Sequence, residues 1–240
     1  MRKGIYILPN LLTVGGMFFG FFSIVASIKG DFDMAAWAIL TATIFDALDG
    51  WVARMTKTTS QFGVELDSLS DLVSFGVAPA VMFYIWALMP FHRWGWVGAF
   101  TFVVCGALRL ARFNVQKVGS EKKWFTGLPI PGGAAALATF VIFWTDVVSV
   151  IPPQNFLVLI MIYIVALLMI STVRFHSLKE LNVRDRRPFW MLLVAVVLLV
   201  AVAANPPVVL FILSMAYIAW ALVEWVLTFR KRRVKMRPQA

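Results

Sequence analysis

The sequence predicts an all-α membrane protein, a polytopic helical bundle of about eight transmembrane helices with both termini cytoplasmic. Of the 240 residues, 61% are hydrophobic and only 14% are charged, which is more apolar than a soluble domain of this size requires. The apolar residues gather in long stretches, each near the ~20 residues that a helix needs to span a bilayer. Nearly all the basic residues fall on one side of these stretches.

The apolar stretches give the expected helices in chain order: about 5–28, 34–55, 66–89, 94–113, 131–151, 156–174, 189–204 and 207–229. Met1-Arg2-Lys3 precedes the first stretch as in a signal peptide, but the length of that stretch favours a retained membrane helix. Pro152-Pro153 and Asn205-Pro206-Pro207 predict the turns before the sixth and eighth helices.

We expect one membrane domain over residues 1–240. Its catalytic core would cover about 5–175, two further helices would follow at about 189–229, and residues 230–240 would form a basic cytoplasmic tail. That tail serves mainly as a positive anchor, with some attraction to anionic lipid headgroups.

The basic residues set the orientation. With a cytoplasmic N-terminus, every lysine and arginine except Lys29 and Arg93 lies on the cytoplasmic side of its helix. The net charge of +10 therefore reflects membrane orientation, and we expect no nucleic-acid partner. This arrangement predicts a protein of the cytoplasmic (inner) membrane, surrounded by membrane lipids.

Two pairs of aspartates interrupt the second and third stretches. Asp46 and Asp49 are separated by one helical turn, as are Asp67 and Asp71, so each pair shares a helix face. Carboxylates at membrane depth are costly and need a compensating partner. If the intervening segment turns the chain back, four carboxylates converge at the cytoplasmic rim and suit hard divalent cations, Mg²⁺ or Mn²⁺.

The residues between the aspartates fit a phosphate ligand. Gly50 and Ala53 are small, which lets a ligand or a second helix approach the backbone. Arg54 lies one turn beyond Gly50 and is suited to a phosphate contact.

Two other interpretations compete with a metal site. A buried salt-bridge network would leave several carboxylates against Arg54 alone, which desolvation makes costly. A divalent-cation or proton transporter would usually carry charges at the middle of several spans, whereas these charges gather at one rim.

The pattern Asp-x-x-Asp-Gly-x-x-Ala-Arg, followed after eight residues by Gly-x-x-x-Asp-x-x-x-Asp, runs from Asp46 to Asp71. It resembles the signature of the CDP-alcohol phosphotransferases, which transfer a phosphatidyl or similar group from a CDP-linked donor to an alcohol. The resemblance implies two divalent cations held by Asp46, Asp49, Asp67 and Asp71, with Asp71 also acting as the catalytic base. It further implies CDP-lipid contacts at Asn10, Thr13, Gly50, Ala53, Arg54, Ser60 and Gly63.

Segments outside the signature indicate the acceptor. Residues 67–80, 109–114 and 125–131 are very similar to the corresponding parts of the type II phosphatidylserine synthases, and this resemblance covers roughly residues 5–135. It implies L-serine as acceptor and CDP-diacylglycerol as donor, with phosphatidylserine and CMP as products. Candidate serine-binding residues are Arg109, Arg112, Asn114, Lys122 and Lys123. An arginine could pair with the serine carboxylate through two hydrogen bonds.

Alternatives to serine stay open. The same transfer could use glycerol-3-phosphate, an inositol phosphate or choline, although a phosphorylated acceptor would require more basic residues around its pocket. The donor could also be an archaeal ether lipid. The family resemblance implies a homodimer.

Overall fold

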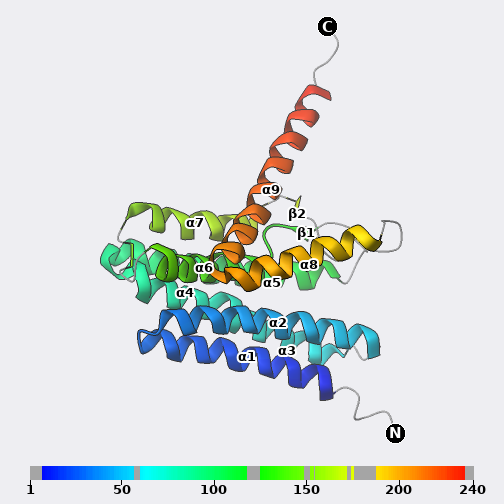
Figure 1. Cartoon of the computed structure of the whole chain (residues 1–240), viewed down its shortest axis with the longest axis horizontal. Helices are drawn as coiled ribbons and strands as arrows, with labels where there is room; N and C mark the ends of the chain where they lie inside the picture. Colours follow the sequence, from blue (N-terminus) through cyan, green and yellow to red (C-terminus); the bar gives the residue numbers. More distant parts are fainter. Residues whose placement is uncertain are drawn as a thin grey trace.

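The protein is a bundle of long helices in the computed structural model (Figure 1), which confirms the all-α class. The structure describes residues 7–56, 60–117, 125–148, 152–153, 155–171, 174–175 and 188–235. Its α-helices are α1 (Ile7–Ile28), α2 (Phe32–Thr56), α3 (Gln61–Asp71), α4 (Ala78–Phe83), α5 (His92–Lys117), α6 (Ile130–Phe143), α7 (Phe156–Ile170), α8 (Pro188–Ala204) and α9 (Pro206–Lys235).

The chain stays helical from α3 to α5, with changes of helix type. The π-helical turn η1 (Leu72–Val77) follows Asp71 directly, and α4 leads into a second π-helical turn, η2 (Tyr84–Leu88), and a 3₁₀ turn, η3 (Met89–Phe91). The chain reverses at His92, whose φ of 48° is left-handed, and α5 packs back along this composite helix.

Five helical stretches among the described residues are long and apolar enough to cross a membrane: Ile7–Ile28, Phe32–Thr56, Gln61–Val115, Ile130–Val148 and Pro206–Val223. The third includes the reversal at His92, and α7 is an apolar helix of shorter length. Many large apolar side chains on these helices are exposed, among them Leu11, Phe18, Phe100 and Leu167, as expected for surfaces that face lipid.

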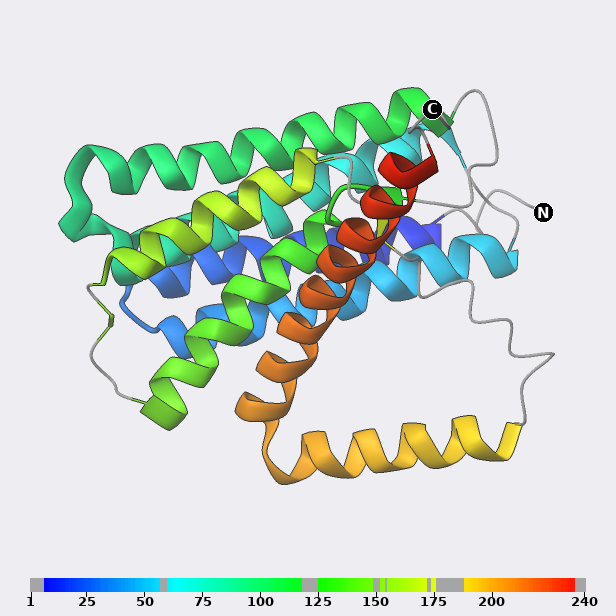
Figure 2. The same ribbon diagram turned by 90° about the horizontal axis from the view of Figure 1, so that it is seen from above.

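The helices form two layers around a common core. Helices α1, α2 and α3 lie together on one side, and α5, α6 and α7 lie on the other, with α4 between them (Figure 1). Phe75, Phe83, Leu137 and Ile142 are among the fully buried side chains at the centre. Helix α9 crosses α6, whereas α8 lies apart from the bundle and meets α9 at the turn that joins them (Figure 2).

Helix α1 approaches the α3–η1 segment closely because small residues line the contact. A Cβ atom on Gly20 would lie 2.6 Å from the Cα atom of Ser74, a distance that real side chains do not tolerate. The hydroxyls of Ser70 and Ser74 donate hydrogen bonds to the carbonyl oxygens of Thr13 and Gly16, at 3.0 and 3.1 Å. The polar serines following Asp67 therefore attach α1 to the helix that carries the second aspartate pair.

The connection into α6 is fixed by backbone contacts with the end of α7. Gly127 has a φ of 88°, and a Cβ atom there would collide with the carbonyl oxygen of Met169. The Leu128 N–H donates to the Leu168 carbonyl at 2.9 Å, and the strands β1 (Phe125–Thr126) and β2 (Arg174–Phe175) form a short antiparallel pair beside it.

Candidate active site

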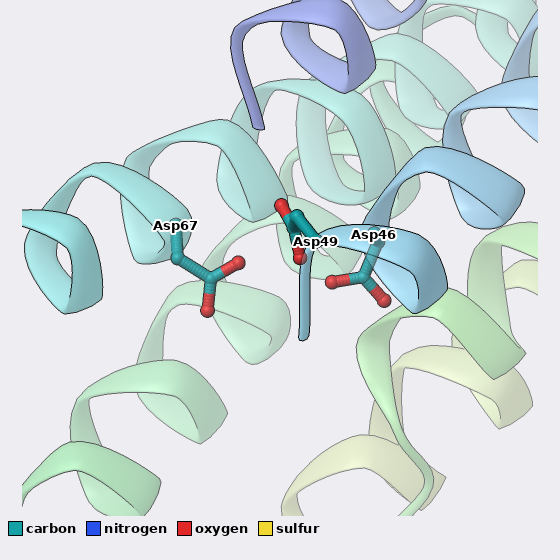
Figure 3. Close-up of side chains that lie close together, drawn as sticks. All are labelled: Asp46, Asp49 and Asp67. Carbon is teal, nitrogen blue, oxygen red and sulfur yellow. The ribbon is translucent and has the colours of Figure 1, made fainter. Parts of the chain in front are cut away.

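The two aspartate pairs converge where α2 and α3 meet beneath α1. Asp46 and Asp49 come from α2 and Asp67 comes from α3, and one carboxylate oxygen from each lies within 4.8 Å of the others. Figure 3 shows the three side chains extending into a common space. The structure thus brings together three of the four aspartates that the spacing predicts.

Asp71 lines the same internal space without joining that group of three. It is the last residue of α3, immediately before the π-helical turn η1, and it borders a small cavity with Asp46, Asp49 and Asp67. A π-helical turn changes the direction of the side chains that follow it, and such turns are frequent at functional sites. Asp71 borders the carboxylate cluster and interacts electrostatically with all three of its aspartates.

Asp49 is held in place by a residue of α1. Its side chain is 6% exposed, and the Thr13 hydroxyl donates a hydrogen bond of 2.6 Å to its Oδ2 atom. The same hydroxyl oxygen lies 3.1 Å from the carbonyl oxygen of Pro9. Thr13 thus orients a buried carboxylate, and this hydrogen bond accounts for the threonine in the predicted site.

The electrostatics of the three carboxylates favour a bound cation. Like charges this close and this poorly solvated repel strongly, because the local dielectric constant is low. Three carboxylate oxygens within 4.8 Å of one another form an all-oxygen donor set, which is the chemistry that Mg²⁺ and Mn²⁺ prefer. The residues therefore fit a divalent metal ion.

A larger cavity of about 220 Å³ adjoins the aspartates. Asp49 and Asp67 form part of its wall, so the cavity and the candidate metal site share two side chains. All the positions expected to contact the CDP-lipid line this cavity: Asn10, Thr13, Gly50, Ala53, Arg54, Ser60 and Gly63. These residues come from α1, from α2 and from the beginning of α3.

Local contacts explain several of these residue types. Ser60 caps α3, because its Oγ atom accepts a 3.0 Å hydrogen bond from the Gly63 N–H. A Cβ atom on Gly63 would lie 3.1 Å from Oδ1 of Asn10, so glycine keeps α1 and α3 close at the cavity. A Cβ atom on Gly50 would lie 3.7 Å from Nη1 of Arg54, the exposed arginine of the cavity wall.

The predicted acceptor residues have different environments. Arg109 is partly buried on α5 and interacts electrostatically with Asp71, whereas Arg112 is exposed. Within the described part of the chain, the Nε atom of Arg109 is buried and has no hydrogen-bond partner. Of the arginines predicted to bind serine, Arg109 is the one with an electrostatic interaction with Asp71.

Asn114 has a contact that the sequence did not indicate. Its Nδ2 atom donates a 2.8 Å hydrogen bond to the Ser68 hydroxyl, which ties α5 to α3 beside Asp67. Helix α5 continues past Asn114 to Lys117, so Asn114 does not end the helix. Lys122 and Lys123 lie outside the described residues.

Tyr217 on α9 is a contact that sequence reasoning missed. It interacts electrostatically with Arg109, which brings a residue of the last helix to the edge of the site. A tyrosine in an apolar helix carries no distinctive motif, so only the packing of α9 on the bundle reveals this contact.

Substitution of Asp67 tests the cation requirement. In EDTA, Asp67→Asn is expected to unfold at a higher temperature than the unsubstituted protein, because one of three crowded charges is removed. Mn²⁺ at about one hundred times its dissociation constant should stabilise the unsubstituted protein by about 2.7 kcal/mol and the variant by clearly less. The measurement is thermal unfolding in detergent.

Glu65→Gln is the matched control, since Glu65 is an exposed carboxylate on the same helix and lies outside the cluster. Equal stabilisation of Asp67→Asn and the unsubstituted protein by Mn²⁺ would contradict a cation at Asp67.

Comparison with known proteins agrees with this arrangement. Residues 6–167 match the family model described as CDP-alcohol phosphatidyltransferase. A CDP-diacylglycerol–serine O-phosphatidyltransferase from Helicobacter pylori (strain J99) is 33% identical over 222 residues, which cover 92% of each chain.

Two archaeal relatives match shorter regions. The archaetidylserine synthase of Methanothermobacter thermautotrophicus is 44% identical over 135 residues, covering 55% of this chain and 57% of the relative. A CDP-diacylglycerol–serine O-phosphatidyltransferase from Methanocaldococcus jannaschii is 52% identical over 103 residues, covering 42% of this chain and 47% of the relative. The aspartate pattern, the matched region and these relatives show that the chain belongs to the CDP-alcohol phosphatidyltransferase family and is a transferase.

Proposed function

We propose that the protein transfers a phosphatidyl group from CDP-diacylglycerol to L-serine and releases CMP. The observation that carries this proposal is the position of Asp71, which borders the carboxylate cluster and interacts electrostatically with Arg109. The names of the relatives from Helicobacter pylori and Methanocaldococcus jannaschii support serine as the acceptor.

The donor would occupy the cavity formed by α1, α2 and α3. Small residues at Gly50 and Gly63 leave room along the helix backbones, and Arg54 supplies a cation for a phosphate at the exposed edge. The cavity ends at Asp49 and Asp67, so the pyrophosphate of a bound CDP-lipid would lie next to the carboxylate cluster. The acyl chains would remain among the lipids around the bundle.

Asp46, Asp49 and Asp67 would hold divalent cations, and Asp71 would complete the set of carboxylates expected for two ions. Bound cations would neutralise the pyrophosphate and stabilise the departing CMP. The contribution of Thr13 is to fix the Asp49 carboxylate, through the hydrogen bond to its Oδ2 atom.

Asp71 would act as the general base. It would take the proton from the serine hydroxyl, and the oxygen would attack the phosphorus that bears diacylglycerol. A new O–P bond forms, the bond from that phosphorus to the bridging oxygen of CMP breaks, and CMP leaves with the electron pair. Proximity between Arg109 and Asp71 would place the hydroxyl of a carboxylate-bound serine near its base.

A single partly buried arginine near Asp71 favours serine over a phosphorylated acceptor. Arg112 is exposed, and Asp71 interacts electrostatically with Arg109. A carboxylate needs one guanidinium, whereas a phosphate would require more positive charge.

The archaetidylserine synthase relative supports an ether-lipid donor as the second candidate, with the same acceptor chemistry. Membership of a transferase family favours catalysis over ion transport.

The proposed topology has eight spans, cytoplasmic termini and an active site at the cytoplasmic face of the inner membrane. The distribution of lysine and arginine supports it. Intact cells would express single-cysteine variants in which Cys105→Ala removes the natural cysteine. A membrane-impermeant maleimide added outside should label Lys29→Cys but should not label Ala240→Cys. The reverse labelling would contradict this orientation. The homodimer stays a prediction, which light scattering in detergent can measure.

The reaction is tested by CMP release from purified protein with CDP-diacylglycerol, Mn²⁺ and L-serine. We expect serine-dependent CMP release, and a fall in kcat by about 10²- to 10⁴-fold in Asp71→Asn, the usual contribution of a general base. Glu65→Gln should retain activity. Release with glycerol-3-phosphate alone would keep the family chemistry but refute serine, and an active Asp71→Asn would refute the assigned base.

Arg109 and Arg112 provide a paired test of acceptor binding. Arg109→Gln should raise the KM for serine roughly 10- to 100-fold, the effect of losing a charge-assisted hydrogen bond. Arg112→Gln should change it less than about threefold, because that side chain is exposed. Steady-state kinetics at saturating CDP-diacylglycerol give both values. Equal effects in the two variants would show that Arg109 has no special role.

A further inference from the structure

We infer that Tyr217 of α9 is a positioning residue for Arg109, so that the last helix completes the acceptor side of the active site. The inference rests on the proposed function, because it assigns Arg109 to the serine carboxylate. Tyr217 lies outside residues 6–167, the region that the family model matches. It would give a catalytic role to a helix that the shared core does not include.

Helix α9 is fixed against α6 by polar and apolar contacts. The hydroxyls of Ser214 and Thr139 are 2.8 Å apart and form a hydrogen bond between the two helices. One turn further along α9, the Tyr217 ring lies against Gly132, where a Cβ atom would be 3.7 Å from Cε1 of the ring. Ile218 and Ala221 are buried on the same part of α9. The ring therefore has a defined position.

Arg109 interacts with groups from two other helices, α3 and α9. Its guanidinium interacts electrostatically with Asp71 and with Tyr217. Helices α5 and α9 both reach the beginning of α6, where Cβ atoms on Gly106 and Gly132 would contact Ile130 and Tyr217 respectively. The Nε atom is buried, and among the described residues no group accepts a hydrogen bond from it. This arginine retains a donor for a ligand while the rest of its side chain is confined.

Confinement matters because arginine has many rotamers. Fixing such a side chain costs up to about 2 kcal/mol of conformational free energy. An oxygen that holds the guanidinium before serine binds would reduce the part of this cost that falls on serine binding. A phenol oxygen suits this task, since it is neutral at ordinary pH and does not compete with the serine carboxylate for charge. Asp71 alone would draw the guanidinium toward the base.

Tyr217→Phe tests this inference, because it removes only the phenol oxygen and keeps the ring that packs on Gly132. The KM for serine should rise about tenfold, while kcat and the KM for CDP-diacylglycerol change less than about twofold, which is the pattern of weakened binding. Tyr163→Phe is the matched control. Its hydroxyl donates a 3.1 Å hydrogen bond to the Trp94 carbonyl, between α7 and the beginning of α5.

A double-mutant cycle separates positioning from packing. If Tyr217 acts through Arg109, Tyr217→Phe should have no further effect on the KM for serine in an Arg109→Gln background. An unchanged KM in Tyr217→Phe, or an additive effect in the double variant, would overturn the inference. A fall in kcat accompanied by a lower unfolding temperature in Tyr217→Phe would identify a packing role, which would also overturn the inference. A wild-type protein without serine-dependent CMP release would instead refute the proposed function, and the inference with it.

Discussion

Repulsion among three crowded carboxylates, one buried and two half-buried, is the constraint on which the rest of the structure depends. Asp46, Asp49 and Asp67 place oxygens within 4.8 Å of one another in a helical bundle that offers little solvation. The fold must hold these groups together against their charge. Helix α1 does so by contacting both partners: Thr13 donates to Asp49, and its own carbonyl accepts from Ser70 on α3. A bound cation would then supply the missing charge.

In the proposed reaction, the aspartates separate a donor side of the site from an acceptor side. On the donor side, α1, α2 and α3 enclose the cavity whose wall includes Asp49 and Asp67. On the acceptor side, α5 brings Arg109 toward Asp71, and α9 brings Tyr217 to Arg109. In this proposal a shared donor-binding core can serve different alcohols, because the helices assigned to the acceptor are separate from those assigned to the CDP-lipid.

Much of the donor side could be predicted from the sequence because its residues are close together in the chain. Helical spacing alone places Asp46 beside Asp49, and the signature includes Gly63, whose missing side chain keeps α3 close to Asn10 of α1 at the cavity. The acceptor side depends on contacts between distant segments. Arg109 and Arg112 have the same residue type and neighbouring positions, and only the packing of α5 distinguishes the partly buried one from the exposed one. Likewise, the hydrogen bond from Asn114 to Ser68 and the placement of Tyr217 follow from tertiary packing, which periodicity does not encode.

The most direct test of the account is to locate the cation. Crystals of the full chain grown with Mn²⁺ and CDP, measured at the manganese absorption edge, would show its position by anomalous scattering. The account predicts anomalous density among the carboxylates of Asp46, Asp49 and Asp67, next to the CDP pyrophosphate in the adjoining cavity. Manganese bound elsewhere, or CDP ordered in the cavity with no density among these carboxylates, would contradict it.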